Sequence, residues 1–174
     1  MKHRLASGLA LGAALLVSAA CADAGAANAD TAGDVAMALA DAPQASISGL
    51  PLALVYKTPS CGCCNGWIEH LEAAGFEVDA RNIRDLMSIK RDAGVPVQLS
   101  SCHTALIDGY VVEGHVPIEQ VQRMLAERPD IAGIAVPGMP TGSPGMEGAN
   151  GKPYQVFSFD NAGHAAVYAE IDPR

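Results

Sequence analysis

The sequence predicts an α/β domain in which strands alternate with helices, followed by a long loop and a terminal β-hairpin. Three observations predict it. A continuous apolar run at 52–56 has the length of a buried strand. Two stretches with apolar residues at helical spacing follow, and an Asp-Gly pair separates two short strand-like segments at 103–114. With 174 residues, 49% of them hydrophobic, the chain can form one domain with a core.

The first half of this domain is predicted as strand, helix, strand and helix. The central strand at 52–56 leads directly into a loop at 59–64. A helix then follows until Gly75, on the spacing of Trp67, Ile68, Leu71 and Ala74. The alternating stretch 76–80 predicts a second strand. Asn82 is expected to cap a second helix that ends at Gly94, with an inner face of Leu86, Ile89 and Ala93.

The second half is predicted as a hairpin, a helix, a loop and a second hairpin. The hairpin at 103–114 precedes a helix that begins at Pro117 and ends before Pro129. The order βαβαββα is that of a thioredoxin-like fold. The stretch 135–153 holds four Pro and five Gly and predicts a loop, and 154–171 predicts a terminal hairpin. A loop of this length in a compact domain is disordered or functional, and its two methionines favour function.

The N-terminus has the pattern of an export signal. A basic start, Lys2 to Arg4, precedes an apolar run of thirteen residues at 5–17. This run is too short to span a bilayer, and small residues follow it, as signal peptidase requires. We therefore predict a signal peptide at 1–22, with cleavage as late as residue 29, and a periplasmic protein without a membrane span.

A flexible Ala/Gly/Asp-rich leader is predicted at 23–49, and the thioredoxin-like domain at 50–174. Cys21 raises the alternative of a lipid anchor on an N-terminal cysteine. Lipoprotein signals usually have Leu three residues before that cysteine, where this chain has Ser18, so a discarded Cys21 is favoured.

Net charge and composition argue against two classes of partner. The formal charge is −8 and the pI is about 4.9, whereas nucleic acid and anionic lipid surfaces attract basic proteins. The chain also has only three Phe, one Trp and four Tyr, too few for a stacking platform. Export into an oxidising compartment adds a further constraint, because unprotected thiols pair there into disulfides.

Three of the five cysteines, Cys61, Cys63 and Cys64, lie between the first strand and the first helix. The partial positive charge of a helix N-terminus favours the thiolate, which is both a nucleophile and a metal ligand. Thioredoxin-like enzymes place a cis-proline before the third strand, facing this loop. When the predicted hairpin takes that position, Cys102 and His103 stand where the proline would be, and we expect them to face the cysteine loop.

The ligand types favour soft metal over a redox pair. Four thiolates are joined in the sequence by His103 or His115 and by Met139 and Met146. We expect the neighbouring side chains of Cys63 and Cys64 to diverge, which disfavours four thiolates on a single tetrahedral zinc ion and favours bridging between ions. Thiolates and thioethers together select Cu(I). The sequence therefore predicts several Cu(I) ions.

Other interpretations remain open. Cys61 or Cys63 can form structural disulfides with Cys102, or Cys61 and Cys64 can form a redox pair with CxxC spacing. In a redox pair, Cys63 would interfere by exchanging with either partner. A copper chaperone without redox chemistry is a third possibility. Outside these motifs we predict a solvated or structural role for His70 and His164 and packing for Met87 and Met124, and we detect no paired carboxylate site.

Three stretches carry a resemblance to a known family: YKTPSCGCCNGW, SSCHTALIDGYVVEGHVP and PGMPTGSPGMEG. Together they resemble the CopG-type periplasmic copper-resistance proteins, long catalogued as a domain of unknown function, from about Leu50 to Ile171. The resemblance implies a thioredoxin-like domain with a cysteine-bridged copper cluster, a role in copper redox handling, and periplasmic copper proteins or an electron donor as partners. It implies these candidate ligands: Cys61, Cys63, Cys64, Cys102, His103, His115, Met139 and Met146.

Overall fold

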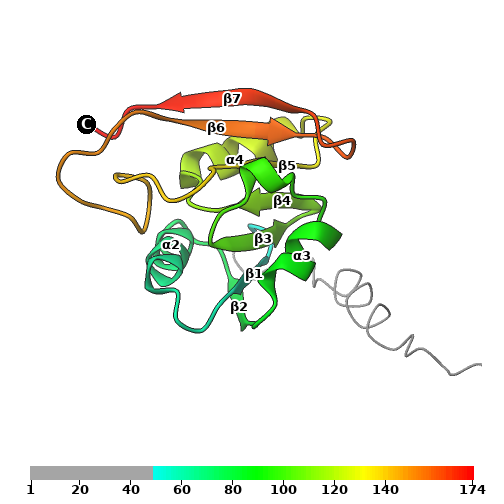
Figure 1. Ribbon diagram of the computed structural model, residues 1–174, viewed down its shortest axis with the longest axis horizontal. Helices are drawn as coiled ribbons and strands as arrows, with labels where there is room; N and C mark the ends of the chain where they lie inside the picture. Colours follow the sequence, from blue (N-terminus) through cyan, green and yellow to red (C-terminus); the bar gives the residue numbers. More distant parts are fainter. Residues whose placement is uncertain (1–48) are drawn as a thin grey trace, which may run out of the picture.

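The structure is a computed structural model that describes residues 49–174 (Figure 1). The predicted signal peptide, Cys21 and all of the predicted leader except its last residue lie outside the described residues. Among residues 49–174, no helix has both the length and the apolar character needed to cross a membrane.

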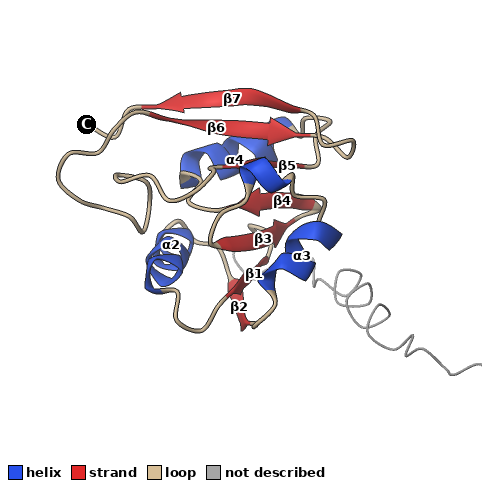
Figure 2. Cartoon of the chain, viewed as in Figure 1, coloured by secondary structure: helices blue, strands red, loops and turns tan. Residues whose placement is uncertain are grey.

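The described chain forms one seven-stranded mixed sheet with helices packed on it (Figures 1 and 2). The strands lie in the order β2-β1-β3-β4-β5-β6-β7. This confirms the predicted mixed α/β class and the terminal hairpin. The elements are β1 (Ala53–Lys57), α2 (Gly62–Ala73), β2 (Val78–Asn82), α3 (Leu86–Asp92), a 3₁₀ turn (Val97–Leu99), β3 (His103–Ile107), β4 (Tyr110–Glu113), α4 (Ile118–Glu127), β5 (Gly133–Ala135), β6 (Tyr154–Phe159) and β7 (Ala165–Ile171).

The pairing of β1 brings two distant segments together. β1 runs parallel to β2, through the α2 crossover, and antiparallel to β3. Lys57, the last residue of β1, therefore pairs with His103, the first residue of β3. The loop after β1 and the segment before β3 consequently lie at the same edge of the sheet. This register explains why 61–64 and 102–103 meet.

Both faces of β1 are covered, which accounts for its continuous apolar sequence. Ala53 and Val55 belong to a core shared with α2 and α4, whereas Leu54 and Tyr56 pack with α3 on the opposite face. Trp67 of α2 is fully buried in the first of these cores. The start of α2 is thereby held against the sheet.

Three helix and strand boundaries differ from the prediction. α2 begins at Gly62, so Cys63 and Cys64 lie in its first turn and Cys61 is its N-cap, whereas all three were predicted in a preceding loop. β2 is shifted by two residues, to 78–82, and α3 begins only at Leu86. Asp85 caps α3 by accepting a hydrogen bond from Ser88 N (3.2 Å), whereas Asn82 accepts one from Lys57 Nζ (2.9 Å). The prediction that Asn82 caps this helix was therefore wrong, because the Asn82 side chain accepts a hydrogen bond from Lys57 instead.

The strand β5 was not predicted, and Ala135 belongs to it instead of to the long loop. β5 runs parallel to β4 and antiparallel to β6, so it joins the terminal hairpin to the main sheet. A Cβ at Gly133 would lie 2.1 Å from the Val111 carbonyl oxygen, so only glycine fits there. Three residues are too few to produce a recognisable alternation.

Candidate metal centre

The first turn of α2 presents three cysteines. Cys61 is the N-cap residue and makes no side-chain capping hydrogen bond, and Cys63 and Cys64 follow in the first turn. No acidic side chain lies in this turn. The unpaired N–H groups of a helix start favour negative charge nearby, so thiolates are well placed here.

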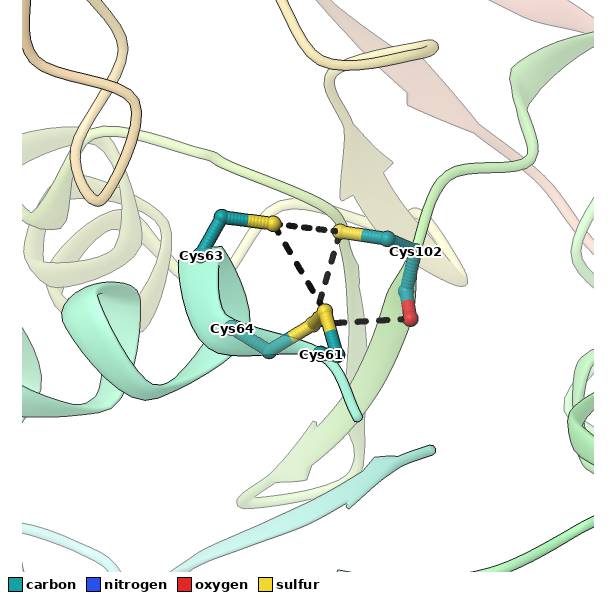
Figure 3. A group of neighbouring side chains, drawn as sticks. All are labelled: Cys61, Cys63, Cys64 and Cys102. Carbon is teal, nitrogen blue, oxygen red and sulfur yellow. Dashed lines mark hydrogen bonds between the residues drawn. A yellow bond between two sulfur atoms is a disulfide. The ribbon is translucent and has the colours of Figure 1, made fainter. Parts of the chain in front are cut away.

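Four sulfur atoms converge at this helix start, and we call Cys61, Cys63, Cys64 and Cys102 the cysteine cluster (Figure 3). Cys61 and Cys64 form a disulfide with a Cα–Cα distance of 5.4 Å. The Cys63 sulfur lies 3.6 Å from that of Cys61 and 4.0 Å from that of Cys102. The Cys64 sulfur lies 3.5 Å from the Cys102 sulfur. All four sulfurs lie within 4.8 Å of one another, so the structure brings Cys102 to the cysteine loop as expected.

Two imidazoles extend the site from the open end of the β3–β4 hairpin. Cys102 Sγ lies 2.9 Å from His115 Nε2 and 3.4 Å from His103 Nδ1. The ligand atoms of Cys102, His103 and His115 lie within 4.8 Å of one another, and we call these residues the histidine group. Cys102 belongs to both sets, so it joins an all-sulfur site to a mixed sulfur–nitrogen site.

Both imidazoles are neutral and available as ligands. His115 Nδ1 donates to the Pro144 carbonyl oxygen (2.8 Å), which leaves the lone pair of Nε2 directed at Cys102. Burial lowers the pKa of His115. Burial also lowers the pKa of His103 well below its usual value, and the positive charge of Lys90 adds to this effect, as would protonation of His115. Within residues 49–174, His103 Nε2 is buried without a hydrogen-bond partner.

Cys102 is a thiol at neutral pH. Burial raises its pKa to about 12, and the neighbouring Cys63 adds to the rise. Its S–H group can therefore donate to His115 Nε2. Trp67 packs against His103, with ring centroids 4.5 Å apart, and donates its indole N–H to Val116 O (2.8 Å). The ring of His103 thus contacts an aromatic ring that a hydrogen bond fixes in place.

The loop that joins β5 to β6, residues 136–153, reaches the site, and we call it the Met loop. Its first part is anchored beside Cys102, because Gly138 N donates to Ser100 O (3.3 Å). Met139 follows, and its sulfur lies 4.0 Å from the Cys63 sulfur. Met146 lies further along the same loop, and within the described chain no hydrogen-bond-range contact joins its sulfur to a cysteine. The structure therefore brings the sulfur of Met139 into contact with the cluster.

The second part of the Met loop packs on the backbone of α2. Gly145 has φ +78°, and a Cβ there would lie 2.5 Å from the Cys63 carbonyl oxygen and 2.6 Å from Trp67 N. A Cβ at Gly66 would lie 2.9 Å from the Gly145 Cα. Two glycines therefore allow the loop and the helix to touch. His70, expected to be solvated only, adds a contact between its Nε2 and Glu147 Oε1 (2.5 Å).

The chain is similar to a known family and to solved structures. A family model described as "Protein of unknown function, DUF411" matches residues 99–146, the stretch from before Cys102 to Met146. Two solved structures named "Copper resistance protein copG", Form 1 and Form 2, are 46% and 47% identical to the chain, each with a TM-score of 0.66. Each alignment covers 70% of this chain and 98% of that structure. The chain belongs to the CopG family. The family predicted from the sequence is thereby confirmed, and no curated protein gives a significant match.

In this CopG-family chain, one expectation about the cysteines was wrong, and one alternative left open by the sequence is not observed. The sulfurs of Cys63 and Cys64 do not diverge, since both lie within 4.0 Å of the Cys102 sulfur. Sulfurs about 3.8 Å apart also fit one tetrahedral ion with bonds of about 2.3 Å, so these distances alone do not exclude a single ion. The structural pairings with Cys102 are not observed either, because Cys63 and Cys102 are free.

A buried ion pair next to the segment that carries Cys102 and His103 was not predicted from the sequence. Lys90 Nζ of α3 contacts Glu113 Oε1 of β4, and their side chains are 3% and 0% exposed. Glu113 pairs with a lysine and not with a second carboxylate, so it forms an ion pair and not a paired carboxylate site. Burial raises the pKa of this carboxyl group, and its hydrogen-bond donors oppose the rise. The sequence indicates only that each residue is buried, since Glu113 ends the apolar run of a hairpin strand and Lys90 follows Ile89 on the inner face of a helix; it does not indicate that they pair.

The remaining histidine and methionine predictions have mixed outcomes. His164 lies beside the β6–β7 turn and contacts Asp160 (Nδ1–Oδ2, 2.9 Å), as a structural residue would. Met124 is fully buried in the core, whereas Met87 is 55% exposed. None of these side chains contacts the cysteine cluster within the described part of the chain.

Proposed function

We propose that this CopG-family chain binds copper through its cysteine cluster and thereby acts in copper resistance. The observation that carries the proposal is the convergence of four sulfurs from two distant segments within 4.8 Å. Thiolate and thioether sulfur are soft ligands that favour Cu(I) over the hard cations bound by oxygen. The two solved relatives are named copper resistance proteins, which supports the same assignment.

The arrangement favours more than one copper ion. Cys102 is shared between the cysteine cluster and the histidine group, and a thiolate can bridge two ions. His103 and His115 supply neutral imidazoles, and Met139, with 53% of its surface exposed, adds a thioether on the outer side. Met146 is proposed as a further ligand only because it lies on the same loop. These residues would hold several Cu(I) ions. The proposal includes a change in the oxidation state of this copper during detoxification or transfer.

Cellular location and fold relationship complete the proposal. The export pattern at 1–22 supports a periplasmic protein. The element order through α4 is that of thioredoxin-like proteins, with the cysteines at the start of the first described helix, which supports descent from that fold. An electron donor or a copper-handling protein of the same compartment would be the partner.

The disulfide makes copper binding dependent on reduction. Cys61 and Cys64 must gain two electrons and two protons before both can act as separate thiols. We expect the reduced protein, loaded with Cu(I) under anaerobic conditions and desalted, to retain at least about twice as much copper as the disulfide form, because two of four sulfurs become available. Metal analysis of both samples tests this. Copper at background in both samples would refute the proposed function.

Met139→Leu is expected to weaken Cu(I) binding about tenfold, since it removes a thioether from the edge of the cluster while keeping the size of the side chain. Competition with a Cu(I) chelator measures the change. Met87→Leu is the matched control, because Met87 is 55% exposed, as against 53% for Met139, and lies on α3, away from the cluster. Equal Cu(I) affinities of the two variants would show that Met139 is not a copper ligand.

A thiol-disulfide oxidoreductase is the second candidate, and the Cys61–Cys64 disulfide favours it. The free thiols of Cys63 and Cys102 lie 3.6 and 3.5 Å from the disulfide sulfurs, within reach of internal exchange. This candidate predicts reduction of insulin disulfides that survives Cys63→Ser and Cys102→Ser. It is rejected when the wild type does not reduce insulin and both variants lose copper. A chaperone that passes copper on without redox chemistry would bind copper but show no turnover.

A further inference from the structure

The buried pair Lys90–Glu113 contacts the segment that carries Cys102 and His103. Glu113 is the cross-strand partner of Thr104 in the β3–β4 hairpin. Its Oε2 accepts a hydrogen bond from Thr104 Oγ1 (2.7 Å), and its Oε1 accepts one from Ser101 N (2.6 Å). Lys90 Nζ contacts Oε1 and also donates to Thr104 Oγ1 (3.1 Å). One carboxylate therefore binds both ends of the segment 101–104.

Stability alone does not account for a fully buried ion pair. Removing two charges from water costs free energy, and apolar residues of similar size often serve a core equally well. This pair instead makes its hydrogen bonds to the two residues that flank Cys102 and His103. The backbone on the other side is fixed too, because Gly114 N donates to His103 O (3.0 Å). The pair is thus arranged to define the position of this short segment.

We propose that Glu113 is a positioning residue of the metal centre, which holds the segment 101–104 so that Cys102 faces the other three cysteines. Lys90 keeps the carboxylate in place and neutralises it. Glu113 itself touches no candidate ligand in the contacts of the described chain; it acts through Ser101 and Thr104. The copper readout of this inference rests on the proposed function, whereas a second readout does not require metal.

Two double variants separate positioning from charge and from folding. Lys90→Met/Glu113→Leu removes both charges and the acceptor of Ser101 N–H. Lys90→Met/Glu113→Gln removes both charges but keeps a side-chain oxygen for Ser101. Neither variant leaves an unpaired buried charge, so we expect both to fold. The Leu variant is expected to bind Cu(I) about 10–100-fold more weakly than the wild type, as is usual when a residue that orients a metal ligand is lost. The Gln variant is expected to keep most of the affinity.

The alkylation rate of Cys102 provides the readout without metal. In the metal-free disulfide form, iodoacetamide labels Cys63 and Cys102, and mass spectrometry of the peptides distinguishes the two. Release of the segment should speed labelling of Cys102 in the Leu variant but not in the Gln variant. Wild-type copper affinity and labelling rate in a folded Leu variant would overturn the inference. A wild type that binds no copper refutes the proposed function instead, and the labelling rates still test the role of Glu113.

Thr104→Val tests the same inference if the Leu variant does not fold. It removes one of the two anchors, keeps the shape of the side chain, and leaves Lys90 paired with Glu113. We expect faster labelling of Cys102 and weaker Cu(I) binding, both by less than in the Leu variant. If the Leu variant does not fold, unchanged labelling and affinity in Thr104→Val overturn the inference.

Discussion

Cys102→Ser is expected to lower the Cu(I) affinity of the reduced protein by at least about 100-fold, because Cys102 belongs to both the cysteine cluster and the histidine group. Its sulfur lies 3.5 Å from Cys64, 4.0 Å from Cys63 and 2.9 Å from His115 Nε2. A serine hydroxyl is a hard ligand and does not replace a thiolate for Cu(I). Competition with a Cu(I) chelator under anaerobic conditions measures the loss.

Cys63→Ser is the comparison for this prediction. Cys63 belongs to the cysteine cluster only, so its replacement should cost less affinity than that of Cys102. Both side chains are partly exposed, and the melting temperatures of the metal-free variants should stay close to that of the wild type. Copper binding by Cys102→Ser at wild-type affinity would contradict the assigned role of Cys102.

Gly145→Ala should displace the Met loop from α2. The added Cβ would lie 2.5 Å from the Cys63 carbonyl oxygen and 2.6 Å from Trp67 N, both backbone atoms that cannot rotate away. Overpacking and a φ of +78° together should lower the free energy of unfolding by about 3 kcal/mol. Displacement would also move the Pro144 carbonyl that fixes His115, so the Cu(I) affinity should fall with the stability. Chemical denaturation and chelator competition measure the two effects.

Gly138→Ala provides the matched control in the same loop. Gly138 also has a positive φ, +66°, but a Cβ there would meet no atom within 4 Å. It should therefore cost only the backbone strain of about 1–2 kcal/mol and leave His115 in place. If both alanine variants have the same stability and the same Cu(I) affinity, the packing of Gly145 on α2 does not support the site.

The sequence predicted those features that depend on local pattern and strand pairing. The continuous apolar run determines the strand β1, and the Asp108–Gly109 turn, whose two residues both have positive φ, determines the β3–β4 hairpin. Placing the hairpin against β1 then brings Cys102 to the start of α2. The meeting of distant cysteines was therefore predictable, because antiparallel strands put the end of one beside the beginning of the next.

Features set by tertiary contact alone were not predictable. β5 has three residues, too few for a period, and forms only because β4 and β6 flank it. The contact of Gly145 with α2 depends on the path of an irregular loop. The pairing of Lys90 with Glu113 requires α3 and β4 to face each other, which no spacing in the chain specifies. The disulfide between Cys61 and Cys64 was one of several pairings that the sequence allowed.

X-ray absorption at the copper edge, combined with metal analysis of the reduced protein loaded anaerobically with Cu(I), tests the central claim most directly. We expect more than one copper per chain, sulfur as the main ligand atom, and copper–copper scattering. We also expect copper to protect Cys61, Cys63, Cys64 and Cys102 from alkylation. Copper absent, or held only by nitrogen and oxygen while all four cysteines remain open to alkylation, would contradict the claim of a copper-binding cysteine cluster. One copper per chain would contradict the claim of several ions.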